Sequence, residues 1–242
     1  MKHSSITAIT KATLLTAISV SIALAQNPDS LGSEMFYPSR LKVGDMRHAA
    51  GVSLSRPPDE VVEEFAAVLT TPLLEYQVQY GLAENFILEG KATTIFASNH
   101  FSAGGKWIFG KSPFGFSIGT DLAFWFGSLK IEGFDNTVSG WTLYPNVSAG
   151  YHFRRFTLTV KFEINMLISK IKRTGTITVQ QNSSEFNGGS VAIYLEQPLW
   201  KNHYVSVGIK SNFVRYYYVV WPGFPTFDHY SYIPEFYMGL IL

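Results

Sequence analysis

Apolar and polar residues alternate over most of the chain, and the pattern runs to its last residue. Residues 230–242 carry an apolar side chain at almost every second position, and about ten stretches of this kind follow one another. Such alternation is typical of a β-strand with one apolar and one polar face. In the clearest stretch the apolar set is Phe156, Leu158, Val160, Phe162, Ile164 and Met166, and the set between them is Thr157, Thr159, Lys161, Glu163 and Asn165. The pattern predicts an all-β protein.

The connections between these stretches alternate in length. Very short turns are predicted at residues 83–85, 111–113, 154–155 and 201–203, and longer connections follow Ser55 and occupy residues 128–140, 169–189 and 221–229. A reversal predicted at Asn99-His100 is also short, although it falls where the alternation calls for a long connection. Short turns on one side and long loops on the other are typical of antiparallel transmembrane β-barrels. We therefore predict a transmembrane barrel of about ten strands from Met46 to Leu242, with Met46–Leu54 as its first strand. Residues 169–189 could instead continue the barrel wall as a β-ribbon.

The first long connection has a different period. From Asp59 to Leu69, Val61, Phe65 and Val68 fall on one helical face, and Pro72 follows. This predicts one short helix, which could be a plain loop helix, a gate or a plug.

The chain begins with the features of a secretory signal peptide. Residues 1–25 have a basic start, an apolar centre and Ala23-Leu24-Ala25 before Gln26, which predicts cleavage after Ala25. Residues 26–45 carry prolines and glycines with little period, and we expect an irregular periplasmic lead-in there. Without Lys2 and Lys11, 17 basic residues face 18 acidic ones, so no nucleic-acid partner is predicted. The chain contains no cysteine, which excludes disulfides and thiolate metal sites.

Two prolines lie at outward positions inside predicted strands. Proline cannot donate to a β-ladder, and a closed barrel has no free edge. We therefore expect Pro145 and Pro234 to mark strand ends on the outer side of the membrane.

Charged residues occupy the inward positions, with both signs mixed. Burying charges in a narrow lumen is costly unless they are paired or hydrated, so a salt-bridged, hydrated interior is predicted. That interior could be filled or could leave a narrow path for solutes. The predicted lumen-facing charged residues are Glu75, Glu89, Lys91, Lys106, Asp121, Lys161, Glu163, Glu196, Lys210 and Glu235.

From Met46 to Leu242 the pattern resembles the small outer-membrane β-barrel proteins of Gram-negative bacteria, such as the opacity-protein and OmpW-like groups. The segment from Tyr80 to Phe86 looks like the periplasmic turn common among them. The resemblance implies architecture and carries no family-specific site. One departure is the C-terminal Leu242, where those families usually end on an aromatic residue that the assembly machinery recognises.

Candidate chemistry is limited to one pair of residues. His100 and Ser102 lie two positions apart on one strand face, which is the minimum for a base beside a nucleophile. The pair resembles the His-x-Ser element of outer-membrane lipid A deacylases, but that family continues with Asn-Ala where this chain has Ala103-Gly104. No carboxylate is evident to orient His100, and the other histidines lack a metal-ligand spacing. We expect no enzyme activity, no cofactor and no metal.

These observations predict an outer-membrane barrel that is either a structural or surface-interaction protein or a narrow channel for small solutes. The alternatives are a soluble exported barrel that binds an apolar ligand and, more remotely, a lipid A-modifying hydrolase. We expect a monomer whose partners are outer-membrane lipid, lipopolysaccharide and the barrel-assembly machinery. Lys170, Lys172 and Arg173 could meet lipopolysaccharide phosphates.

Overall fold

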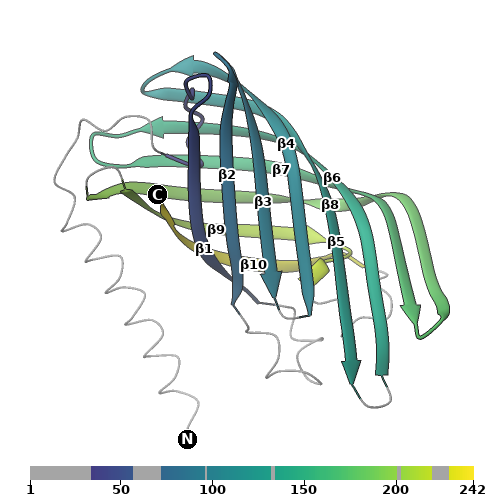
Figure 1. Cartoon of the computed structure of the whole chain (residues 1–242). Coiled ribbons are helices and arrows are strands. Elements are labelled where there is room, and N and C mark those ends of the chain that lie inside the picture. Colours follow the sequence, from purple (N-terminus) through teal and green to yellow (C-terminus); the bar gives the residue numbers. More distant parts are fainter. Residues whose placement is uncertain (1–33, 57–71, 96, 132–133, 201–202, 220–228) are drawn as a thin grey trace, which may run out of the picture.

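The computed structural model describes residues 34–56, 72–95, 97–131, 134–200, 203–219 and 229–242. Ten strands form a closed barrel (Figure 1). The strands are β1 Met46–Ser55, β2 Leu73–Ala83, β3 Phe86–Ile95, β4 Ser98–Lys111, β5 Phe114–Ile131, β6 Phe134–His152, β7 Thr157–Thr174, β8 Ile177–Trp200, β9 His203–Val214 and β10 Ser231–Ile241. The prediction of an all-β antiparallel barrel of about ten strands is confirmed.

Every strand pairs antiparallel with its neighbours in sequence, and the first and last strands close the barrel. Ala49 of β1 lies opposite Ile241 of β10, and Ser55 lies opposite Glu235. The chain enters β1 and leaves β10 at one end of the barrel, where the short turns between β2 and β3, β4 and β5, β6 and β7, and β8 and β9 also lie. We call this the short-turn end.

At the other end the predicted loops are largely replaced by strands. β5 and β6 pair as far as Ile131 and Phe134, so the loop expected at residues 128–140 is wrong. β7 and β8 likewise pair out to Thr174 and Ile177, and the β-ribbon considered for residues 169–189 is what the structure contains. Figure 1 shows both hairpins projecting past their neighbours. Main-chain hydrogen bonds continue the ladder in both hairpins, although apolar and polar side chains alternate little there.

Two local predictions also need correction. The reversal expected at Asn99-His100 lies earlier, between Ile95 and Ser98, so both residues belong to β4. Pro145 lies in the middle of β6 and marks no strand end. β6 tolerates it because the pairing with β7 is interrupted beside it: Leu143 pairs with Met166, and the next pair is Asn146 with Glu163. Pro234 lies near the start of β10, beyond the last residue that β1 pairs.

The barrel is apolar outside and polar inside. Phe162 and Ile164 of β7 are 52% and 48% exposed, whereas Thr157 and Thr159 on the same strand are each 1% exposed. No helix in the described part of the chain is long and apolar enough to cross a membrane. The helix predicted from Asp59 to Leu69 and the signal peptide of residues 1–25 lie outside the described residues.

Candidate functional site: the barrel lumen

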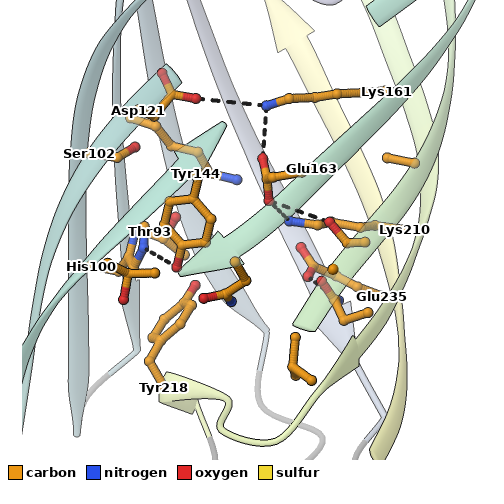
Figure 2. A pocket seen from close by; sticks show the side chains of 18 of the residues that line it. Thr93, His100, Ser102, Asp121, Tyr144, Lys161, Glu163, Lys210, Tyr218 and Glu235 are labelled. Atoms are coloured by element: carbon orange, nitrogen blue, oxygen red, sulfur yellow. Dashed lines mark hydrogen bonds and ion pairs between the residues drawn. The ribbon is translucent and has the colours of Figure 1, made fainter. Parts of the chain in front are cut away.

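A network of ion pairs crosses the lumen. Lys161 of β7 lies 3.0 Å from Glu163 and 3.9 Å from Asp121 of β5. Lys210 of β9 approaches Glu163 from the other side at 2.9 Å (Figure 2). Asn146 donates to Asp121 over 3.0 Å. Glu163 is therefore shared by two lysines from different strands, which ties together parts of the wall that are not neighbours in the sheet.

Two further pairs lie on the β2, β3 and β4 side. Lys91 contacts Glu75 at 2.6 Å, and Ser53 donates to the same carboxylate over 2.6 Å. Lys106 pairs with Glu89. All four predicted lumen lysines thus have carboxylate partners, so their charges are compensated inside the barrel.

Glu235 of β10 accepts hydrogen bonds in place of an ion pair. The Tyr217 hydroxyl donates to it over 2.8 Å, and the Asn212 amide donates over 3.4 Å. Burial raises the pKa of the Tyr217 hydroxyl well above its ordinary value, and the neighbouring Glu235 raises it further. Tyr217 therefore remains a donor at any ordinary pH.

A cavity of about 100 Å³ lies among these residues. One water molecule occupies roughly 10–15 Å³ on this scale, so the cavity has room for several. Aromatic side chains narrow it on several sides, and the ring of Phe36 closes it toward the short-turn end. The aromatic lining is Phe36, Trp125, Tyr144, Tyr194, Tyr216, Tyr217 and Tyr218. This arrangement can hold water and small polar groups but leaves no wide pore.

The segment after β9 folds over the opposite side of the cavity. Asn187, the extra residue of a β8 bulge, donates to the Tyr216 carbonyl and accepts from the Tyr216 N–H, each over 2.8 Å. The Tyr216 ring packs on Trp125 with centroids 5.0 Å apart, and the Lys170 ammonium lies 4.4 Å from its centroid. Lys170, one of the three cations expected to meet lipopolysaccharide phosphates, is thus buried against the Tyr216 ring, whereas Arg173 is exposed.

The N-terminal segment from Glu34 enters the short-turn end of the barrel. The Glu196 carboxylate of β8, which is fully buried, accepts hydrogen bonds from the main-chain N–H groups of Met35, Phe36 and Tyr37 at 2.7, 3.0 and 2.8 Å. Among the described residues no cation forms an ion pair with Glu196, and these three N–H donors hold its carboxylate instead. The lead-in, expected to lie in the periplasm, therefore occupies the barrel end from residue 34 onward.

Wall side chains hold the same segment at other points. Arg47 donates to the carbonyls of Glu34 and Arg40 at 2.7 and 3.3 Å. Gln79 donates to the Met35 carbonyl over 2.8 Å. The Phe36 ring stacks on Tyr194 with centroids 3.8 Å apart. The segment is therefore bound by both polar and aromatic contacts.

The structure places all ten charged residues predicted for the lumen on its inner side. Eight line the central cavity; Glu75 lies beside it in contact with Lys91, and Glu196 binds the N-terminal segment. Glu196 is not in the ion-pair network that the mixed charges suggested. Sequence reasoning also missed the contribution of residues 34–37, although Met35-Phe36-Tyr37 is an apolar run in an otherwise irregular stretch.

The His100 and Ser102 pair is not arranged as a base and a nucleophile. The His100 Nε2 atom lies 3.3 Å from the Tyr144 hydroxyl, and its ring stacks on Tyr218 with centroids 4.6 Å apart. Both His100 and Ser102 line the cavity in Figure 2, but among the described residues no hydrogen bond joins them. Within the same residues there is no group of three or more histidines and carboxylates suited to a metal ion.

A second hollow, of about 640 Å³, lies on the outer wall beside the break in the β6–β7 ladder. Its lining is almost entirely apolar and includes Pro145, Val147, Phe162 and Phe213. Glu163 and Ser190 border both this hollow and the inner cavity. The inner cavity and the outer hollow therefore lie on opposite sides of the same part of the wall.

No protein-family model matches the sequence, and no curated protein matches it at a significant level. Several solved structures are similar to it. The outer-membrane protease OmpT from Escherichia coli is 12% identical, with a TM-score of 0.46 and coverage of 87% of this chain and 99% of that one. The KdgM porin is 9% identical, with a TM-score of 0.38 and coverage of 81% and 98%.

The Neisserial surface protein A is 8% identical, with a TM-score of 0.37 and coverage of 81% of this chain and 94% of that one. With TM-scores below 0.5 and identities of 8 to 12%, these likenesses support no conclusion about what this chain does.

Proposed function

We propose that the chain is an integral outer-membrane β-barrel whose hydrated lumen forms a narrow path for small solutes, closed in the present state. The observation that carries the membrane assignment is the apolar outer surface. Each of the ten strands exposes at least one large hydrophobic side chain to the outside, for example Leu54 on β1, Trp107 on β4, Ile209 on β9 and Met238 on β10. A surface of this kind on a monomer in water would be strongly unfavourable, whereas hydrocarbon covers it at no cost.

Aromatic clustering at the short-turn end supports the same assignment. Phe114 packs on Tyr151, Tyr151 on Phe153, and Phe153 on Phe156, with centroids 4.6 to 4.8 Å apart. Aromatic belts of this kind favour the interface between lipid and water. Short turns lie on the periplasmic side in outer-membrane barrels, so we infer that this end faces the periplasm.

The soluble alternative requires the opposite arrangement of side chains. A soluble barrel that carries an apolar ligand would turn its apolar faces inward, but here the cavity is lined by Lys161, Glu163, Lys210 and other polar groups. A hydrated lumen with paired charges favours a narrow solute path. The second candidate, a structural or surface-interaction protein, is favoured by the small cavity and by the projecting β5–β6 and β7–β8 hairpins.

Spin labels test the membrane assignment. Labels replacing Phe162 and Ile209, which are 52% and 51% exposed, should be shielded from a water-soluble relaxant when the protein is in lipid vesicles. Ile177, 69% exposed at the tip of the β7–β8 hairpin, is the matched control and should remain accessible. Equal accessibility at Phe162 and Ile177 would refute the assignment.

A further inference from the structure

We propose that residues 34–42 form a releasable plug, latched by Glu196, whose withdrawal opens the lumen toward the short-turn end. This inference rests on the proposed function, since it concerns the path through the same lumen. The plug is a segment of the chain itself and lies directly before β1. Its contacts with the wall provide the argument.

The latch is concentrated in one carboxylate. Both oxygens of Glu196 are engaged, Oε1 by the N–H groups of Met35 and Phe36 and Oε2 by that of Tyr37. The Thr157 hydroxyl also donates to Oε2, over 3.4 Å. Because one carboxylate accepts all three main-chain hydrogen bonds, a single change at Glu196 would weaken three contacts with the plug at once.

The wall is shaped to receive the plug. A Cβ atom on Gly81 would lie 2.2 Å from the Lys42 carbonyl oxygen, and one on Gly115 would lie 2.5 Å from the Pro38 carbonyl oxygen. A Cβ on Gly150 would lie 2.6 Å from the Tyr37 ring. Side chains at these positions would collide with the segment. Glycines on three different strands therefore make room for it.

The Phe36 ring is the part of the plug that closes the cavity toward the short-turn end. Its ring stacks on Tyr194 at 3.8 Å and meets the edge of Tyr237 at 5.3 Å, while also bordering the central cavity. Withdrawal of residues 34–42 would remove this ring from the cavity boundary and leave the polar interior continuous with the barrel end.

The plug can leave without disturbing the barrel ladder. Glu196, Arg47 and Gln79 bind its main chain through their side chains, so these bonds can be lost while every strand pair remains intact. Gly44 separates the plug from β1 and has a φ of +88°, a conformation that glycine adopts readily. A Cβ atom on Gly44 would have no neighbour within 4 Å, and the Gly44 N–H donates to the Gly81 carbonyl of β2 over 2.9 Å. The hinge therefore stays attached to the wall while residues 34–42 move.

Release is measured by labelling a cysteine in the plug. The chain contains no cysteine, so Met35→Cys introduces a single thiol at a side chain that is 2% exposed. In detergent micelles, Glu196→Gln should increase the rate of labelling by a water-soluble maleimide by about tenfold or more, because the amide has one acceptor oxygen where the carboxylate uses two. Glu185→Gln, the same change on the distant β8 hairpin, is the matched control and should leave the rate unchanged. Phe36→Ala, which leaves the latch carboxylate in place, should also accelerate labelling and serves if Glu196→Gln fails to fold.

Conductance in planar bilayers tests whether the plug is the barrier. Glu196→Gln should conduct at least tenfold more than the wild type. In a Tyr37→Cys/Gly150→Cys variant that also carries Glu196→Gln, a short bis-methanethiosulfonate, which joins the two thiols through disulfides with release of methanesulfinate, should abolish the gain, and reductant should restore it. Unchanged labelling in both release variants, or faster labelling without any rise in conductance, would overturn the proposal. A wild-type chain that does not insert into bilayers at all contradicts the membrane assignment instead, and labelling in micelles then still reports on the plug.

Discussion

Glu163→Gln should be one of the most destabilising isosteric changes in the barrel. The carboxylate lies 3.0 Å from Lys161 and 2.9 Å from Lys210, and its side chain is 12% exposed. The glutamine keeps the shape of the side chain but removes its charge. Lys161 retains Asp121 at 3.9 Å, whereas Lys210 has no other carboxylate within ion-pair distance among the described residues. The loss in free energy of unfolding therefore arises chiefly from Lys210, whose charge is left without a partner.

The magnitude follows from distance and burial. At an effective dielectric constant of about 20, two unit charges 2.9 Å apart attract by roughly 6 kcal/mol, most of which offsets desolvation. Removing one partner of a buried pair typically costs about 3–5 kcal/mol, because the other charge is left without compensation. Lys210 is 25% exposed and borders a cavity with room for water, so we expect the lower limit, about 3 kcal/mol.

Urea unfolding of the protein in lipid vesicles, followed by tryptophan fluorescence, measures this cost. Adding Lys210→Met to Glu163→Gln should recover about half of the lost free energy of unfolding, because the uncompensated cation is then removed. Glu185→Gln, on an exposed hairpin, should change stability by less than about 0.5 kcal/mol. A Glu163→Gln cost no larger than that of the control, or strictly additive effects in the double variant, would refute the reasoning.

The remaining predictions concern the wall, the two ends of the lumen and catalysis. Ile209→Arg places a charge on the lipid-facing side and should cost about 2–4 kcal/mol in vesicle unfolding, whereas Ile177→Arg at a hairpin tip should cost almost nothing; equal costs would contradict a lipid-facing β9. Asn187→Ala removes both 2.8 Å bonds to Tyr216 and should cost about 2 kcal/mol, with a change in Trp125 fluorescence; an unaltered emission spectrum would show that this segment does not depend on Asn187. Gly150→Leu should displace the plug and speed the labelling of Met35→Cys, and slower labelling would be inconsistent with the clash at Tyr37. Lipid A deacylation should be absent from the wild type and from His100→Ala alike; activity that is lost in the variant would establish the hydrolase alternative.

The strands could be predicted because one physical constraint acts on nearly every residue. Side chains in a barrel wall point alternately to hydrocarbon and to the lumen, so Phe162 and Glu163 must differ in polarity. β1 begins where the alternation begins, at Met46, and ends one residue past the predicted Leu54. The constraint weakens at the projecting hairpins, where Asn136 and Val138 are both buried although one is polar and the other apolar. The β5–β6 ladder continues there through main-chain hydrogen bonds that leave little trace in the side chains.

The contacts at the ends of the lumen could not be predicted from periodicity. Glu196 binds residues about 160 positions away, and its neighbours in the sequence give no sign of this. The prediction for Pro145 is wrong for a related reason. The rule against proline in a ladder assumes that the neighbouring strand requires the bond, and here the opposite residues of β7 do not pair with β6 and pair only with β8. Local patterns specify which face a side chain occupies, and they do not specify its partner across the barrel.

The position of Met35 has a consequence for the order of assembly. Met35 packs against Ala49 of β1, Tyr204 of β9 and Ile241 of β10, so its binding surface combines the first strand with the last two. The N-terminal part of the chain is synthesised first, yet its docking surface is complete only when β10 has joined β1. Pairing of β1 with β10 and docking of the N-terminal segment are therefore coupled, late events in biogenesis. A chain that stops before Ser231 could complete neither of them.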